Sequence, residues 1–299
     1  MDLDDFSIAV FCLVDEAMPR VTGGHRLRER GPDPILADSE VLTLEIVGEY
    51  LGLIQDSALF AYFRQQYAHF FPALARLHRT TFVRQAANLW RLKERLWQEV
   101  LRRVPHDEHV AIIDSFPIPV CQFARAHRCR RCRRFRAEAA YGKDTLVRQT
   151  FYGLRVHVRV EWPGVITRFG IAAANVHELA ALPALTEATQ GTLVGDRNYW
   201  SPAVAAEWQQ HGVDLLAPYR TAKHDPHPRW SARLSRVRYR IDTVFGQLVD
   251  RCNVKRLWAR DLWHLANRLL RKVLMHTVAI LFNIELGNPP LQLARVVVS

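Results

Sequence analysis

Through the first hundred residues, apolar side chains recur at intervals of three or four positions, the spacing of amphipathic helices. The pattern predicts helices over about 4–19, 38–51, 57–67 and 80–102. Asp38 or Ser39 is the expected N-cap of the second helix, because short polar side chains accept a hydrogen bond from the first turn. We therefore expect an all-helical domain over residues 1–105. Three short helices with a basic last one suit a helix-turn-helix DNA-binding domain, and a plain helical bundle is the alternative.

The pattern changes after Pro105. Four apolar residues run into Asp114 and predict a buried strand over 110–113, and Pro117 and Pro119 are expected to stop its regular pairing. Further strands are predicted over 150–160, 165–173, 192–196 and 213–217. Helices are expected over 179–188, from 202, from about 232 and over 262–284, the last with Arg268, Arg271 and Lys272 on its polar side. Residues 106–299 therefore read as an α/β domain with a mixed five-stranded sheet, flanking helices and a C-terminal helix.

Carboxylates stand at three comparable places in this second domain. Asp114 and Asp196 each end a predicted strand, and Asp242 lies on the helix after the last strand. A single aspartate at a strand end is usually explained by capping of the turn that follows. A hairpin beside parallel strands with acids at these three places, however, is the ribonuclease-H-like arrangement, in which the carboxylates converge. Two Mg²⁺ ions about 3.5–4 Å apart, for which Mn²⁺ can substitute, would neutralise them and clamp an in-line phosphoryl displacement.

The charge of the chain indicates a polyanionic partner. The 299 residues carry a formal net charge of +11, and so basic a protein often binds nucleic acid, although an arginine-rich solvated surface is the alternative. The densest positive charge lies within residues 124–136, where guanidinium groups can fork onto phosphate oxygens. We expect its arginines to contact DNA: Arg125, Arg128, Arg130, Arg131, Arg133, Arg134 and Arg136. A solvated basic loop is the alternative for this segment.

Five cysteines, an odd number, argue against a disulfide scaffold. With an acidic N-terminus and no apolar run long enough for a bilayer, the chain is expected to work in a reducing cytoplasm without a membrane partner. Cys129-x-x-Cys132, with Cys121 and His127 nearby, could form one zinc site. No second Cys-x-x-Cys pair exists, so free thiols on a basic loop are the expectation.

Four blocks of sequence resemble the DDE transposases of bacterial insertion sequences, most closely insertion-sequence family nine-eight-two. The blocks are Ile113–Cys121, Phe151–His157, Gly195–Tyr199 and Arg240–Phe245, and the resemblance covers about residues 38–286. It implies a ribonuclease-H-like core behind a helical DNA-binding domain. It also implies cleavage at transposon ends and attack of the freed 3′-hydroxyl on target DNA. The implied partners are double-stranded DNA, both ends and target, and further copies of the chain in a dimer or larger assembly, with the protein on the nucleoid when bound.

The sequence departs from that family at the third acid, which is usually glutamate and here is Asp242. The family's Tyr-Arg-Glu-Lys signature is partly kept: Arg238 holds the Arg place, whereas Ser235 and Val249 replace Tyr and Lys, and Arg251 or Lys255 can substitute for Lys. These departures leave two alternatives open, an inactive DNA-binding descendant and a metal-dependent nuclease.

Several other residues are expected near the site or the DNA. Asn198 and Tyr199, with Arg238 and Lys255, are predicted DNA contacts, and packing of Tyr199 and Trp200 against the sheet is the alternative. Lys143 and Arg155 are further phosphate contacts without a motif behind them. His177 and Glu178 either support a catalytic base or cap a helix.

Overall fold

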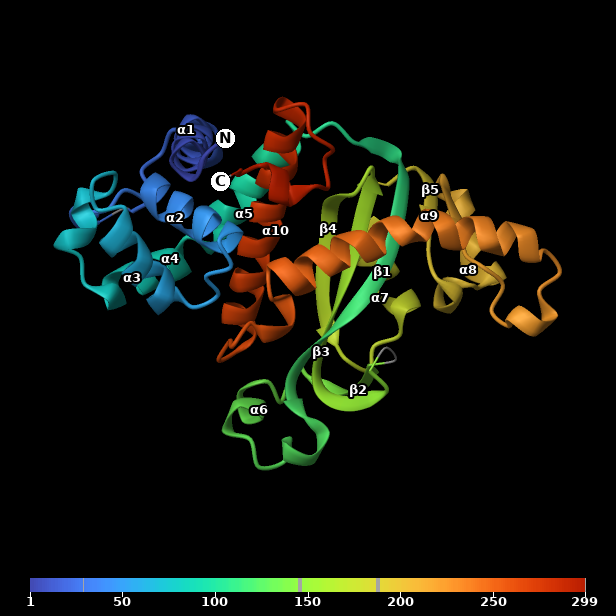
Figure 1. Ribbon diagram of the computed structural model, residues 1–299. Coiled ribbons are helices and arrows are strands. Elements are labelled where there is room, and N and C mark those ends of the chain that lie inside the picture. The colour runs from blue at the N-terminus through green and yellow to red at the C-terminus, as the bar shows by residue number, and fades with distance from the viewer. Residues whose placement is uncertain (29, 145–146, 187–188, 299) are drawn as a thin grey trace. The chain divides into compact units, whose positions relative to one another are not determined.

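The computed structural model describes residues 1–28, 30–144, 147–186 and 189–298, and the chain divides into two compact units (Figure 1). Unit 1 consists of Met1–Val104, Leu248–Ala259 and Trp263–Ser299, and unit 2 consists of Pro105–Gln247 and Arg260–Leu262. The division at residue 104 coincides with the change of pattern at Pro105. The C-terminal residues group with the N-terminal helices, whereas their sequence was read as part of the second domain. Among the described residues, no helix combines the length and the hydrophobicity needed to span a bilayer.

In the described part of unit 1 there are six longer helices. They are α1 (Leu3–Thr22), α2 (Asp38–Tyr50), α3 (Asp56–Gln66), α4 (Arg79–Asn88), α5 (Trp90–Leu101) and α10 (Leu262–Glu285), with short turns η1 (Pro72–Ala75), η5 (Gln247–Arg251), η6 (Val254–Arg256) and η7 (Leu293–Arg295). Two predictions about helix ends are wrong. The N-cap of α2 is Ala37, whose N–H donates to the Glu40 carboxylate over 2.7 Å, while Asp38 pairs with Arg28. The single helix predicted over 80–102 is two helices that meet at Leu89. Leu89 is buried like the apolar residues on either side, so the spacing of apolar residues does not reveal the break.

Helix α10 lies in the core of unit 1 rather than on its surface. Its residues from Leu269 to Asn283 are buried, and Thr277 accepts a hydrogen bond from the Trp97 indole of α5 over 3.1 Å. Arg271 and Lys272, expected on the polar side of an amphipathic helix, are buried and paired with Glu49 of α2 at 2.6 Å. Buried cations require such partners, since desolvation of an unpaired charge is costly. The sequence pattern cannot separate a buried, paired charge from an exposed one.

Unit 2 holds one six-stranded sheet. The strands are β1 (Asp107–Gln122), β2 (Ala140–Asp144), β3 (Gln149–Trp162), β4 (Val165–Ala173), β5 (Gly191–Val194) and β6 (Val213–Leu216). Their order is β2-β3-β1-β5-β6, and β4 pairs with β3 on the side where β2 also pairs. Strand β3 is antiparallel to its neighbours, while β5 and β6 are parallel to β1. This arrangement confirms the ribonuclease-H-like α/β prediction, with the short strand β2 added to the expected five.

The prediction that prolines stop the pairing of β1 is wrong. Pro117 pairs with Arg155 and Pro119 with Gly153 of β3, and a register shift follows only between Pro119 and Cys121. The two prolines lie two residues apart, so their nitrogens face the same edge of the strand; both keep Cα partners on β3, while pairing with β5 ends at Ile112. A proline whose nitrogen faces an unpaired edge is compatible with a strand. Asp114 consequently lies inside β1, paired with β3 and two residues beyond the end of the pairing with β5.

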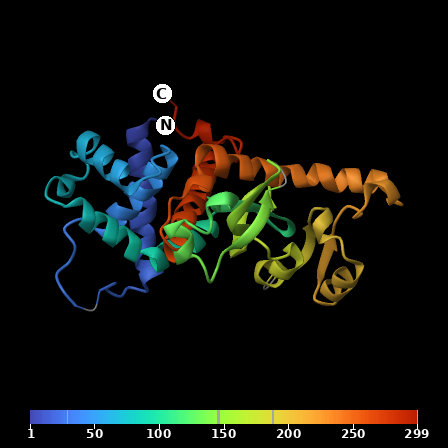
Figure 2. The same ribbon diagram turned by 90° about the horizontal axis from the view of Figure 1, so that it is seen from below.

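Helices cover both faces of this sheet. They are α7 (Glu178–Thr186), α8 (Pro202–Gln210) and α9 (Pro228–Gly246), with α6 (Arg130–Arg134), η2 (Phe123–Arg125), η3 (Arg197–Tyr199) and η4 (Ala222–His224) in the connections. Residues 187–188 of the helix predicted over 179–188 lie outside the described residues. Ala111 and Ile113 pack in one cluster with Leu182 and Leu185 of α7. Phe116 of β1 contacts Phe245 of α9 on the other face, and α9 crosses the sheet there (Figure 1, Figure 2). Because side chains alternate along a strand, Asp114 shares the α9 face with Phe116.

Candidate active site

Asp114 lies in β1, and Asp196 follows the end of β5, the parallel strand beside it. Ile112 of β1 pairs with Val194 of β5, and each aspartate follows its paired residue by two positions. The two carboxyl groups are close enough for the charge of Asp196 to raise the pKa of Asp114. The structure thus brings together the two acids that the sequence placed at strand ends.

Asp114 is a buried carboxylate with one cationic partner. Its side chain accepts a hydrogen bond from the Ser115 N–H over 2.7 Å and from Arg238 Nη1 over 2.6 Å. Burial raises the pKa of Asp114 to about 7, because desolvation penalises the charged form more than the Ser115 N–H and Arg238 favour it. Asp196 and Glu178 add to the increase. A strongly perturbed acid of this kind is typical of a catalytic site.

Asp196 is held by the turn that follows β5. Its carboxylate caps η3, accepting from the Asn198 N–H over 2.8 Å and from the Asn198 side-chain amide over 3.1 Å. Burial raises its pKa, and the charge of Glu178 raises it further. Gly195 makes this turn possible, since a Cβ there would lie 2.7 Å from atoms of Tyr199. The sequence Gly-Asp-Arg-Asn-Tyr therefore positions the second acid through its own local contacts.

Asp242 reaches the site through Arg238. It lies one helical turn after Arg238 on α9, and its carboxylate is 3.8 Å from Arg238 Nη2 while Arg238 Nη1 contacts Asp114. The Asp242 side chain is 44% exposed, so it is the most accessible of the three predicted acids. Arg238, which the sequence suggested as a DNA contact, here bridges the first and third acids.

Glu178 is a further acid beside the pair. It begins α7, and its carboxylate accepts from Ser115 Oγ over 2.9 Å and from Arg155 Nη1 over 3.3 Å. The His177 ring accepts from the Leu179 N–H over 3.2 Å, so His177 caps the helix as one alternative expected. Arg155 also donates to Ser115 Oγ, which fixes it among these side chains. The sequence signal for Glu178 was its place directly after the third predicted strand.

The remaining predicted contacts fall in different places. Tyr199 is fully buried in the core cluster, so the packing alternative describes its ring. Asn198 is exposed beside Asp196, and Lys143 is exposed on β2. Lys255 is half-buried in η6 of unit 1, whereas the acids belong to unit 2. Six of the seven arginines of the basic segment, defined as residues 124–136, are exposed, and Arg131 of α6 is partly buried.

The carboxylates of the site suit a hard cation. Asp114 and Asp196 offer oxygen ligands of the kind that Mg²⁺ prefers, and burial first, then the negative charges nearby, raises their pKa values. In the described part of the chain, no three carboxylates have oxygens all within 4.8 Å of one another. The residues present therefore fit a divalent ion at Asp114 and Asp196, with Asp242 and Glu178 beside them.

Comparison with known proteins agrees with this geometry. A family model described as Transposase DDE domain matches residues 105–261, more than half of the chain and nearly all of unit 2. None of the curated proteins and none of the solved structures compared with the chain matches it. The matched range includes all three predicted acids, the basic segment and α9. The chain therefore belongs to the Transposase DDE domain family, whose members are transposase-type nucleases.

Proposed function

We propose that this protein is a DNA transposase of an insertion sequence. In this proposal it binds the ends of the element, cleaves DNA strands by metal-dependent hydrolysis and joins the 3′-hydroxyl ends to target DNA by phosphoryl transfer. The observation that carries the proposal is the placement of Asp114 in β1 beside Asp196 just after the paired strand β5, in a chain of the DDE transposase family.

Each acid has a role that follows from its surroundings. Asp114 and Asp196 would hold Mg²⁺, with Mn²⁺ as a substitute, because they are neighbouring carboxylates whose pKa values are raised by burial. When bound, the ions would activate the attacking oxygen and stabilise the charge that develops on the phosphate. Arg238 neutralises Asp114 through its ion pair. Asp242, one turn away on α9, is the proposed third ligand.

DNA contacts are proposed on both units. The exposed guanidinium groups of the basic segment would bind the phosphate backbone. Phosphate contacts contribute affinity that does not depend on the DNA sequence. Asn198, beside Asp196, would contact the strand at the site. The helices of unit 1 would read the element's ends, and Lys255 would add a phosphate contact there. Two copies of the chain, one for each end, would act together on the DNA.

An inactive DNA-binding descendant is the second function that a specific observation favours. Asp242 is one methylene shorter than the family's usual glutamate, and its carboxylate is half-exposed and 3.8 Å from Arg238. A degraded third ligand would leave DNA binding intact and abolish cleavage. A metal-dependent nuclease without strand transfer would keep cleavage and lack joining.

The test measures Mg²⁺-dependent nicking and joining of labelled transposon-end DNA. Asp114→Asn and Asp196→Asn keep shape and remove charge, so each is expected to reduce nicking about a hundred- to a thousand-fold, the loss typical of removing one essential electrostatic group, without weakening DNA binding. Asp214→Asn is the matched control, because Asp214 is an exposed aspartate on β6 of the same sheet. Asp242→Glu tests the third ligand.

Each outcome separates the functions. Nicking that survives Asp114→Asn contradicts the carboxylate mechanism. An inactive wild type that gains nicking with Asp242→Glu establishes the inactive descendant. Nicking without joining to a target plasmid establishes the nuclease.

A further inference from the structure

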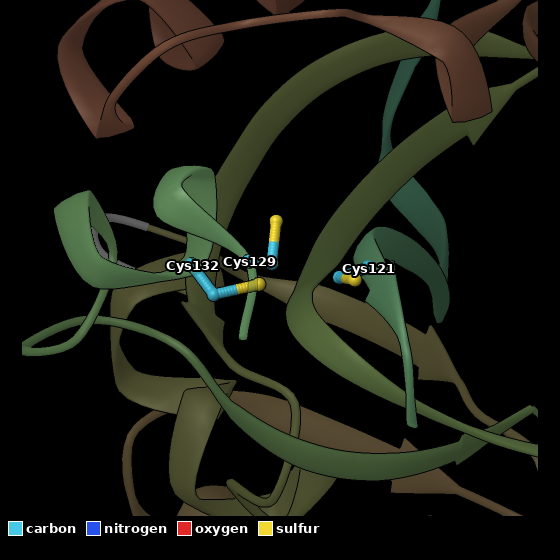
Figure 3. A group of neighbouring side chains, drawn as sticks. All are labelled: Cys121, Cys129 and Cys132. Carbon is cyan, nitrogen blue, oxygen red and sulfur yellow. The ribbon is translucent and has the colours of Figure 1, made fainter. Parts of the chain in front are cut away.

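Three cysteines that the proposed reaction does not use lie together in unit 2. The sulfur atoms of Cys121, Cys129 and Cys132 are all within 4.8 Å of one another, and Figure 3 shows their side chains gathered at one place. Among the residues that the structure describes, no other three histidine, cysteine or carboxylate side chains have ligand atoms this close together. All three are free thiols.

The backbone brings these thiols together from two separate segments. Cys121 lies at the end of β1, directly after the register shift that follows Pro119, and such irregularities are a means by which strands re-aim side chains. Cys129 is the N-cap of α6 and Cys132 lies within its single turn. The Cys129 N–H donates to the Arg125 carbonyl over 3.0 Å, which closes the turn before α6. A Cys-x-x-Cys pair on such a turn, with a third ligand from a strand, is an arrangement typical of structural zinc sites.

The basic segment has little else to hold it in shape. Between Phe123 and Glu138, the buried side chains are Ala126, Cys132 and Phe135. The same stretch carries seven arginines, whose mutual repulsion opposes a compact conformation. A core of three side chains is too small to stabilise a folded segment, and small elements of this kind usually depend on a metal ion or disulfide.

The chemistry of the group selects zinc. Soft thiolate ligands favour Zn²⁺ over Mg²⁺. Zn–S bonds of about 2.3 Å place tetrahedral sulfurs about 3.8 Å apart, so the three sulfurs need only a small approach from their present spacing. Three thiolates and one Zn²⁺ carry a net charge of −1, which the surrounding guanidinium groups offset. Water or the exposed imidazole of His127 can take the fourth coordination position.

We propose that Cys121, Cys129 and Cys132 bind one structural Zn²⁺ ion that fixes the basic segment to the end of β1. The ion is distinct from the Mg²⁺ expected at Asp114 and Asp196, because its ligands are sulfurs on another part of unit 2. The proposal does not depend on the transposase reaction.

The test is the metal content of the full-length protein, purified under reducing conditions without chelators. The wild type is expected to contain one equivalent of zinc. Cys121→Ser and Cys132→Ser are expected to lose it, and Cys12→Ser, a change at an exposed cysteine of α1, is the matched control that retains it. Co²⁺ added to the zinc-depleted wild type should give sulfur-to-metal charge-transfer bands, which report thiolate ligands, and the visible d–d bands of tetrahedral coordination.

Limited trypsin digestion provides a second measurement that does not depend on the stability of a variant. The arginines of the basic segment are tryptic sites, so chelation of zinc from the wild type should speed cleavage there at least ten-fold, and returned zinc should reverse the effect. Zinc-free wild type that also fails to bind Co²⁺ with its thiols reduced would overturn the proposal. Equal zinc in Cys121→Ser, Cys132→Ser and Cys12→Ser would also overturn it, as would a disulfide among these cysteines in the freshly purified protein.

Discussion

Arg238 of α9 donates to the Asp114 carboxylate of β1 over 2.6 Å, so the cationic partner of the most perturbed acid comes from the helix that also carries Asp242. Burial raises the pKa of Asp114 to about 7, and Arg238 works against this increase. The arginine therefore keeps part of the Asp114 population charged near neutral pH, the form that binds a metal ion.

Arg238→Gln is expected to raise the pKa of Asp114 further, because it removes the cation that favours the charged form. The midpoint of the pH profile for Mg²⁺-dependent nicking should move up by about one unit. Arg236→Gln, a change at an exposed residue of the same helix, should leave the midpoint in place. If the variant does not nick DNA, titration of carbon-13-labelled aspartate carboxyls by NMR measures the same shift. An Asp114 pKa that does not change would contradict the proposed effect of Arg238.

Asp114→Asn is expected to stabilise the metal-free protein at alkaline pH. The folded-state pKa of Asp114 is raised to about 7, so folding becomes less favourable as the pH rises from the unfolded value of about 3.9 to the folded value. Asparagine does not ionise and escapes this penalty. The gain in free energy of unfolding over the wild type should be about 1–3 kcal/mol larger at pH 8 than at pH 5.5.

Thermal unfolding in the presence of a chelator at the two pH values measures this difference. Asp214→Asn, the exposed control on β6, should show no pH-dependent gain. A gain for Asp114→Asn that is the same at both pH values would show that the carboxylate is not destabilised by burial.

Replacement of Arg130, Arg131, Arg133 and Arg134 by alanine should weaken binding to all DNA sequences alike. The affinity falls as salt rises, and each lost phosphate contact reduces the magnitude of the slope of log K against log salt by about one. The slope should therefore fall by up to about four, measured by fluorescence anisotropy across a salt series. Lysine at the same four positions keeps the charge and should keep the slope. An unchanged slope in the alanine variant would remove the basic segment from the DNA-binding surface.

Arg271→Leu is expected to destabilise unit 1 strongly. Arg271 pairs with Glu49, Glu45 and Asp56, at 2.6, 3.3 and 2.8 Å. Burial raises the pKa of Asp56, but the charges of Arg271 and Arg268 outweigh it and lower that pKa to about 2. Loss of a buried partner leaves uncompensated charge, which costs about 3–5 kcal/mol.

Chemical denaturation of the full chain measures this cost, and Arg295→Leu, at an exposed position of unit 1, is the control. The same ion pairs also predict how truncated chains fold. A fragment of residues 1–104 lacks the cations of α10 and should show no cooperative unfolding, while a chain that joins 1–104 to 248–299 through a linker should. Cooperative folding of the short fragment would show that α10 is dispensable.

Most of unit 2 could be predicted because its signals are local. Alternating or continuous apolar runs marked β3, β4, β5 and β6, and the acids at Asp114 and Asp196 followed from their places after such runs. The effect of Pro117 and Pro119 could not be predicted, because a proline disrupts a strand only on the edge where its nitrogen meets a partner. The short strand β2 depends on pairing with β3 and lacks a strong pattern of its own.

The remaining misses share a physical cause, which is contact between residues far apart in the chain. Lys272 and Glu49 satisfy each other across 223 positions, and neither residue type indicates burial by itself. Leu89 interrupts a helix without glycine or proline. For Glu178 the sequence left two roles open, and the contacts with Ser115 of β1 and Arg155 of β3, which place it beside the acids, could not be read from the sequence.

The ion pairs between α2 and α10 also set an order of events during synthesis. The carboxylates of Glu45 and Glu49 leave the ribosome early, whereas Arg271 and Lys272 follow only after the whole of unit 2 has been translated. Until then, the carboxylates of α2 lack the cations that pair with them, and the apolar side chains that α10 covers stay uncovered. A chain interrupted before α10 would therefore carry nearly all of unit 2 and yet lack a finished helical unit.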